Sequence, residues 1–166
     1  MTLFSRVFLG LLLLASSGLP AVGDTFLDQL SGTWTGGGWE KRNLDAVREA
    51  LRCDFAFVAK DRAELLSISG RCAGGGKRND IWAEIRSLGG GRYRASWMDA
   101  GRKFEDMAGL LDGRALTFTW RIFDKDSGGA VSGDFNLELS GGSLILRTGQ
   151  NHPGAGELGR LQLQRR

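Results

Sequence analysis

Residues 51–72 read LRCDFAFVAKDRAELLSISGRC, and this stretch decides the fold. Apolar and polar residues alternate on both sides of the central Lys-Asp-Arg, and this period of two predicts two β-strands joined by a turn. An antiparallel pairing of the two cysteines also brings the apolar residues of both strands onto one face. The cysteine pair and the hydrophobic pattern therefore demand the same register. The facing pairs in that register are Cys53 and Cys72, Phe55 and Gly70, and Phe57 and Ile68.

The same alternation recurs along the rest of the chain, with glycine clusters between most of the alternating segments. Strands so close together in sequence do not form parallel pairs, because a parallel crossover needs a dozen or more residues. We therefore predict an all-β fold, an antiparallel meander closed into a barrel of about eight to ten strands, with a two-sheet sandwich as the alternative. The expected strands lie near residues 32–35, 51–57, 66–72, 81–85, 92–97, 103–110, 116–122, 131–139, 144–146 and 161–163.

Two segments have helical features. Residues 25–30 fit one short capped helical turn that precedes the first strand. Residues 43–51 begin with a capping asparagine and place Leu44, Val47 and Leu51 at helical spacing, but they run directly into the strand at Cys53. Helix and strand remain open for residues 43–51.

The first 23 residues have the three parts of a secretory signal peptide. Arg6 gives the positive start, residues 7–15 are an apolar run, and residues 21–23 are small enough for a cleavage site. Nine apolar residues span only about 14 Å as a helix, against roughly 30 Å of membrane hydrocarbon, so a membrane anchor is disfavoured. We expect a signal peptide at residues 1–23, a single barrel domain at 24–166 and a periplasmic or secreted location without stable membrane insertion.

Export changes the interpretation of the cysteines and of the charge. In an oxidising compartment, Cys53 and Cys72 are expected to form a disulfide, with two separate buried thiols as the alternative. The net charge of +3 falls to +2 when the signal peptide and its Arg6 are removed. Arg92, Arg94 and Arg121 lie on polar strand faces, but acidic residues are interspersed, so we expect no nucleic-acid binding.

Gly32-Thr33-Trp34, on the first expected strand after a short helical turn, resembles the N-terminal Gly-x-Trp signature of lipocalins and related calycin barrels. The resemblance implies a barrel whose base is closed by Trp34, packed against a basic residue late in the chain; Arg147 and Arg160 are the candidates. A disulfide across an internal hairpin and long glycine runs depart from the lipocalin pattern. The layout also resembles small exported bacterial barrel proteins of unassigned function.

Three glycine-containing motifs lack the context that their chemistry requires. Residues 154–159 match G-x-G-x-x-G, but the seven residues that follow alternate as a strand, whereas a dinucleotide site needs a helix there. Residues 74–78 lack the first glycine and the Ser/Thr of a phosphate loop, so they fit a turn with a basic tip. Residues 124–129 resemble the start of a calcium loop, but Phe135 stands where the bidentate glutamate belongs.

The remaining polar residues form no recognisable catalytic set. His152 is the one histidine, in a segment of loop composition, and Glu157 is the only acid close to it. A haem-ligand role for His152 or Tyr93 and an acid–base role for the neighbouring Glu105 and Asp106 have no supporting partners. We therefore expect no catalytic residue, metal ligand or cofactor, and we expect that the protein is not an enzyme.

Aromatic residues are the most informative group. Inward aromatic residues either fill a small barrel or line an apolar pocket. We predict a carrier of a small apolar or amphipathic ligand; the alternative is a filled barrel that contacts an envelope protein or inhibits an exported enzyme. Trp82 lies on the face opposite Ile81 and Ala83, so it is a candidate for such a contact if that face is the exterior. The predicted ligand-binding residues are Phe55, Phe57, Trp97, Phe118 and Trp120.

Overall fold

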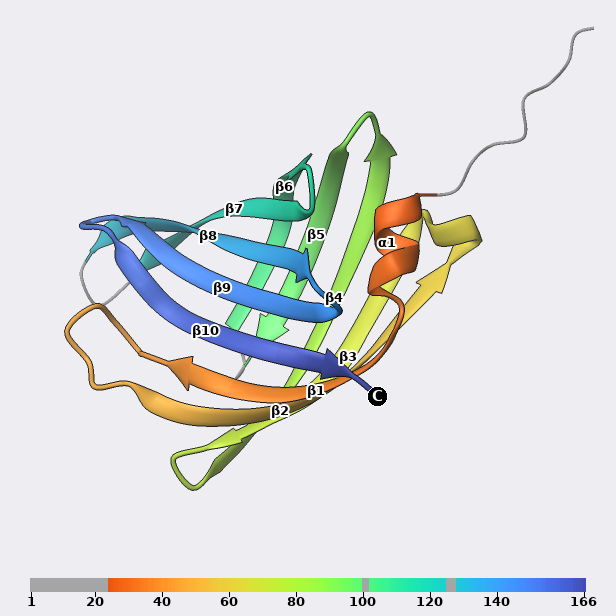
Figure 1. The fold of residues 1–166 in the computed structure, drawn as a ribbon. Helices are drawn as coiled ribbons and strands as arrows, with labels where there is room; N and C mark the ends of the chain where they lie inside the picture. The colour runs from red at the N-terminus through yellow and green to blue at the C-terminus, as the bar shows by residue number, and fades with distance from the viewer. Residues whose placement is uncertain (1–23, 100–101, 125–127) are drawn as a thin grey trace, which may run out of the picture.

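In the part of the chain that the structure describes, ten antiparallel strands form a closed barrel, in the order in which they occur along the chain (Figure 1). This computed structural model describes residues 24–99, 102–124 and 128–166, so the predicted signal peptide lies outside the described residues. The expected antiparallel meander is confirmed, and β1 closes it against β10 instead of leaving two sheets. The elements within the described ranges are α1 (Thr25–Leu30), β1 (Gly32–Glu40), β2 (Glu49–Lys60), η1 (Asp61–Ala63), β3 (Leu65–Gly74), β4 (Lys77–Gly89), β5 (Arg92–Asp99), β6 (Arg102–Asp112), β7 (Ala115–Asp124), β8 (Gly129–Ser140), β9 (Ser143–His152) and β10 (Gly156–Arg165).

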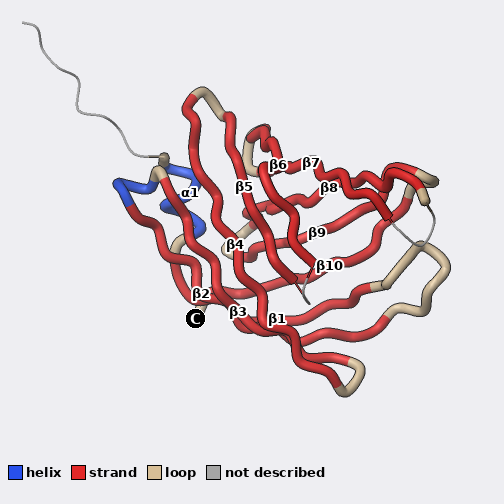
Figure 2. Tube along the Cα trace, turned by 180° about the vertical axis from the view of Figure 1, so that it is seen from behind, coloured by secondary structure: helices blue, strands red, loops and turns tan. Residues whose placement is uncertain are grey.

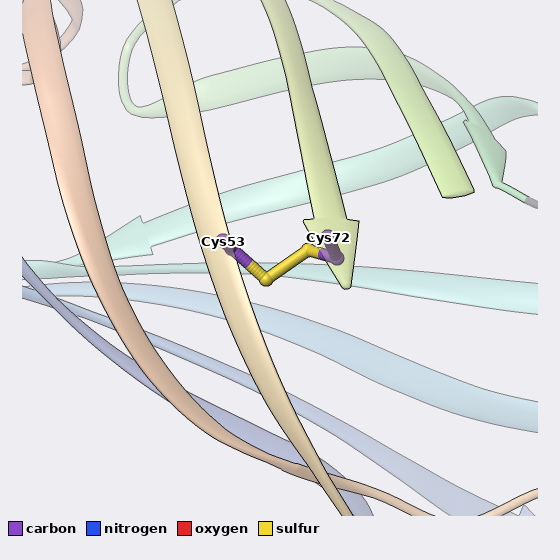
Figure 3. Close-up of a disulfide and its surroundings, with 2 residues drawn as sticks. All are labelled: Cys53 and Cys72. Atoms are coloured by element: carbon purple, nitrogen blue, oxygen red, sulfur yellow. A yellow bond between two sulfur atoms is a disulfide. The ribbon is translucent and has the colours of Figure 1, made fainter. Parts of the chain in front are cut away.

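The hairpin of β2 and β3 has the predicted register. Cys53 faces Cys72 across the ladder, and a disulfide joins them (Figure 3). Phe55 faces Gly70 two residues further along. Both cysteines are buried, so the disulfide belongs to the interior face of the barrel wall. The cysteine pairing and the register are both confirmed.

Residues 43–51, left open between helix and strand, form no helix. Residues 43–46 are turns and bends, and β2 begins at Glu49. Asn43 caps only a local turn, in which its side-chain oxygen accepts a hydrogen bond from the backbone N–H of Asp45 at 3.1 Å. Val47, which a packed helix would bury, is 84% exposed. The helical spacing does not produce a helix here: Leu51 packs against the core as part of β2 while Val47 is left in solvent, so the three residues share no buried face.

The helix α1 closes one end of the barrel, and the loop between β1 and β2 stands at the opposite end (Figure 2). Phe26, Leu27 and Leu30 of α1 are buried against the inward side chains of the strands. No helix in the described ranges is long and apolar enough to cross a membrane. We call the end covered by α1 the closed half. Its fully buried strand residues are Trp34, Phe57, Leu66, Ile68, Ile85, Leu116, Phe118, Leu137, Leu144 and Leu163.

Trp34 seals the closed half, as the Gly-x-Trp resemblance implies. Its indole N–H donates a hydrogen bond to the Leu30 carbonyl at 2.8 Å. The basic residue that covers the ring is Arg165, whose guanidinium carbon lies 4.7 Å from the ring centroid. Expecting Arg147 or Arg160 in this place was wrong, because the register of β1 on β10 sets Trp34 opposite Arg165. Because cross-strand partners share a face of the sheet, this register determines which basic side chain lies against the Trp34 ring.

Asp24 fastens α1 to the barrel wall. Its carboxylate caps α1 by accepting hydrogen bonds from the N–H groups of Phe26 and Leu27, and it accepts further bonds from the hydroxyls of Ser87 and Tyr93, both at 2.7 Å. Burial opposes the charged form, but these hydrogen bonds outweigh it and lower the pKa of Asp24. Burial, together with the bond to Asp24 and its negative charge, raises the pKa of the Tyr93 hydroxyl.

These opposite shifts predict how stability depends on pH. The lowered pKa of Asp24 contributes stability above its ordinary value of 3.8, and that contribution is lost as the pH falls toward the folded-state value. The raised pKa of Tyr93 contributes stability below its ordinary value of 10.0, which is lost as the pH rises above it. We expect Asp24→Ala to lower the free energy of unfolding by about 1 kcal/mol near neutral pH. Urea unfolding at several pH values should also show a weaker acid dependence in this variant; an unchanged dependence would contradict this role of Asp24.

Candidate functional site

A cavity of about 640 Å³ occupies the half of the barrel opposite α1, which we call the open half. Small-molecule sites in proteins commonly have about 300–1,000 Å³. The deep wall is apolar and includes Cys72 of the disulfide. The barrel is therefore filled in its closed half and hollow in its open half. The aromatic residues that line the cavity are Trp39, Phe55, Trp97, Phe104, Trp120 and Phe135.

Glycine in β1 lets the neighbouring strand β10 approach closely. Gly36 and Gly38 pair with inward residues of β2 and β10, so their own inward positions carry no side chain. The approach of β10 also demands glycine, because a Cβ at Gly36 would lie 2.1 Å from the Gln162 carbonyl oxygen. The glycine run at 36–38 thus lies inside a strand instead of separating two strands.

Two aromatic rings of the cavity wall lie over glycines of the neighbouring strand. Phe55 covers Gly70, where a Cβ would lie 2.2 Å from the ring. Trp120 covers Gly133 in the same way, at 2.4 Å, and its indole N–H donates to the Asp134 carbonyl at 3.2 Å. The rings therefore lie against the wall, and the centre of the open half stays empty.

Three of the five predicted ligand-binding residues line the cavity, namely Phe55, Trp97 and Trp120. Phe57 and Phe118 are packed in the closed half, 2% and 0% exposed, and do not line this cavity. The alternation that selected the five residues is the same in both halves. It identifies which side chains point inward, but it does not show whether each one lies in the filled or in the hollow half of the barrel.

The prediction from the sequence missed three aromatic residues that line the cavity, namely Trp39, Phe104 and Phe135. Phe135 packs on Trp97 with ring centroids 4.5 Å apart, and Phe104 packs on Trp120 at 5.5 Å. The alternation of residues 131–139 marks Phe135 as inward, so a signal for it existed. Phe104 lies beyond an irregularity between Ala95 and Trp97 in the pairing of β5 with β6, and simple alternation does not place it.

Polar residues gather at the mouth of the cavity. Lys41 and Arg42 come from the loop between β1 and β2, and Asn79 and Gln150 come from β4 and β9. In the described ranges no charged side chain is buried. The loop at the mouth is tied to the barrel by a hydrogen bond from the Lys41 N–H to the Leu158 carbonyl at 2.6 Å. The arrangement suits a molecule with an apolar body inside and a polar end at the mouth.

The acidic residues and the histidine considered from the sequence do not converge on the cavity. Glu105 and Asp106 form ion pairs with Lys103 and Arg94 on the outside of the barrel. His152 is exposed at the end of β9. Within the described part of the chain, no three His, Cys, Asp or Glu side chains lie close enough together to hold a metal ion. Residues 125–127 of the calcium-like segment lie outside the described residues.

Trp82 lies on the outer face of the barrel, where it is 40% exposed. It faces Met98 of β5, which is 43% exposed. The two side chains form a small apolar area away from the cavity.

Comparisons with known proteins identify the fold. No protein-family model and no curated protein matches the chain. The structure of Rv2717c from M. tuberculosis superposes with a TM-score of 0.65 at 13% identity, covering 87% of this chain and 99% of that one. The S-type phycobiliprotein lyase CPES from Guillardia theta superposes with a TM-score of 0.52 at 11% identity, covering 85% and 90%. At these identities the likeness concerns the fold alone, and this chain has the fold of a small antiparallel β-barrel of the lipocalin and calycin type.

Proposed function

We propose that this protein is an exported, non-enzymatic binding protein that holds a small apolar or amphipathic molecule in the open half of its barrel. The cavity of about 640 Å³ carries this proposal, because it is large, apolar in depth and polar at its mouth. Phe55, Trp97 and Trp120 provide ring surfaces for the ligand. The disulfide and the N-terminal 23 residues support export.

The absence of catalysis is part of the proposal. One structural neighbour is named a phycobiliprotein lyase, which gives a precedent for an enzyme on this fold. In this chain, Arg147 lines the cavity but is engaged with Glu138 at 2.6 Å. Glu40 also lines the cavity, beside the loop at its mouth, but the deep wall presents rings, aliphatic groups and a disulfide, which supply no acid or base for proton transfer.

Titration with N-phenyl-1-naphthylamine, an uncharged apolar dye that fluoresces in dry surroundings, tests the proposal. We expect saturable binding, and we expect Trp97→Ala to weaken it roughly tenfold, because truncation removes ring contacts worth about 1–2 kcal/mol. Trp82→Ala is the matched control and should bind normally. Equal binding by all three proteins, or no binding by the wild type, would contradict the proposal.

Export has its own test. We expect the protein recovered from the envelope of a bacterial host to begin near Asp24, as intact-mass measurement would show. A recovered chain that retains residues 1–23 would contradict export by a cleaved signal peptide.

A second function, contact with an envelope protein through the outer face, is favoured by the exposed pair of Trp82 and Met98. A partner that is retained by the wild-type protein and lost with Trp82→Ala would support it. Recovery of the same partner by both proteins would contradict this role of Trp82.

A further inference from the structure

The barrel wall splits between β6 and β7. Their ladder runs only from Asp112, paired with Ala115, to Ala108, paired with Thr119. β6 nevertheless extends to Arg102 and β7 to Asp124, and both remain paired with their other neighbours. Figure 1 shows the two strands diverging after they meet. Over residues 103–107 and 120–123, the two strands therefore form no ladder with each other.

A β-bulge in β6 accounts for the split. Ala95 of β5 pairs with Met107, but Trp97, two residues on, pairs with Phe104, so β6 carries an extra residue there. Asp106 in the bulge has a φ of 56° and forms an ion pair with Arg94 of β5. Such bulges bend a strand and end its pairing. The bulge thus directs this part of β6 toward β5 and away from β7.

A cleft of about 470 Å³ lies in the split and shares part of its lining with the cavity. Phe104, Met107, Trp120 and Ile122 line both the cleft and the cavity. The rings of Phe104 and Trp120, one from each strand, are in contact with centroids 5.5 Å apart. Apolar side chains, not a hydrogen-bonded ladder, therefore separate the cavity from the outside at this point.

We propose that this cleft is the entry site for the ligand, and that it admits the uncharged apolar end of the molecule first. The inference rests on the proposed binding function. Displacing Phe104 and Trp120 requires side-chain rotation and the loss of the Trp120 hydrogen bond to the Asp134 carbonyl, but it breaks no strand ladder. The loop at the mouth, by contrast, is held against β10 by the backbone hydrogen bond from Lys41 to the Leu158 carbonyl. Charged residues also line the cleft, namely Lys103, Glu105, Asp106 and Arg121, but the four side chains shared with the cavity are apolar, so this part of the passage favours an uncharged leading end.

Stopped-flow fluorescence with N-phenyl-1-naphthylamine tests the route of entry. Thr119 is exposed and lines only the cleft, so Thr119→Tyr fills the cleft without altering the cavity wall. We expect this variant to slow association and dissociation together, each roughly tenfold, with little change in affinity. Asn43→Tyr places the same side chain in the loop at the mouth, beside the cavity, and should leave both rates near those of the wild type.

Phe104→Ala supplies an independent variant in the opposite direction. We expect faster association, whereas loss of a ring contact alone would raise only the dissociation rate. Slower exchange in Asn43→Tyr with normal exchange in Thr119→Tyr would overturn the inference and assign entry to the mouth. Unchanged rates in Thr119→Tyr and Phe104→Ala would also overturn it. Failure of the wild-type protein to bind the dye would instead contradict the proposed function itself.

Discussion

Trp34→Ala is expected to lower the free energy of unfolding by about 3–5 kcal/mol, the usual cost of truncating a buried aromatic side chain. Trp34 is 1% exposed, its indole N–H bonds to Leu30 at 2.8 Å, and its ring packs on Phe57 with centroids 6.5 Å apart. Truncation opens a void beneath α1 and leaves the Leu30 carbonyl without this donor. Urea unfolding measures the loss.

Trp82→Ala is the matched control for this experiment. Trp82 is 40% exposed on the outer face, so its truncation leaves no enclosed void, and a loss below about 1 kcal/mol is expected. Arg165→Ala tests the cation separately from the ring. Arg165 contributes by stacking and side-chain packing on Trp34, so its truncation should lower the free energy of unfolding by about 1 kcal/mol. Equal losses for Trp34→Ala and Trp82→Ala would contradict the account of the closed half.

Removing the disulfide is the second large perturbation. The bond between Cys53 and Cys72 closes a loop of 18 intervening residues, which constrains the unfolded chain by about 3 kcal/mol on the loop-entropy model. We expect the free energy of unfolding of the double variant Cys53→Ala/Cys72→Ala to be lower than that of the wild type by about this amount. The fold should persist, because the ladder of β2 and β3 extends well beyond the cysteines on the side of η1.

A reductant provides the control for the disulfide prediction. Wild-type protein unfolded in urea with dithiothreitol should have the stability of the double variant, and the double variant should not respond to dithiothreitol. Thermal or urea unfolding that is the same with and without the disulfide would contradict its stabilising role.

The hairpin of β2 and β3 was predictable because two independent constraints agree. A shift of one residue would turn Phe55 outward and would also separate Cys53 from Cys72. No such second constraint acts on β1 and β10. The sequence signature of Trp34 indicates a basic partner, but the choice of Arg165 depends on a register between the two ends of the chain.

The shape of the interior was harder to predict. Alternation marks Phe55 and Phe118 alike as inward, although one lines the cavity and the other is packed in the core. In the run at 36–38, glycine marks a close approach of β10 to β1 and not a turn. That meaning becomes visible only when the pairing partners are known, because a glycine run in sequence also fits a turn.

The five tryptophans provide the most direct test of the central claim that the open half binds an apolar ligand and the closed half does not. Each indole N–H gives its own signal in a nitrogen–proton NMR spectrum, and single Trp→Phe variants assign the signals. On titration with N-phenyl-1-naphthylamine, the signals of Trp97 and Trp120 should shift, and those of Trp34 and Trp82 should stay in place. Shifts at Trp34 or Trp82 without shifts at Trp97 and Trp120 would contradict the claim.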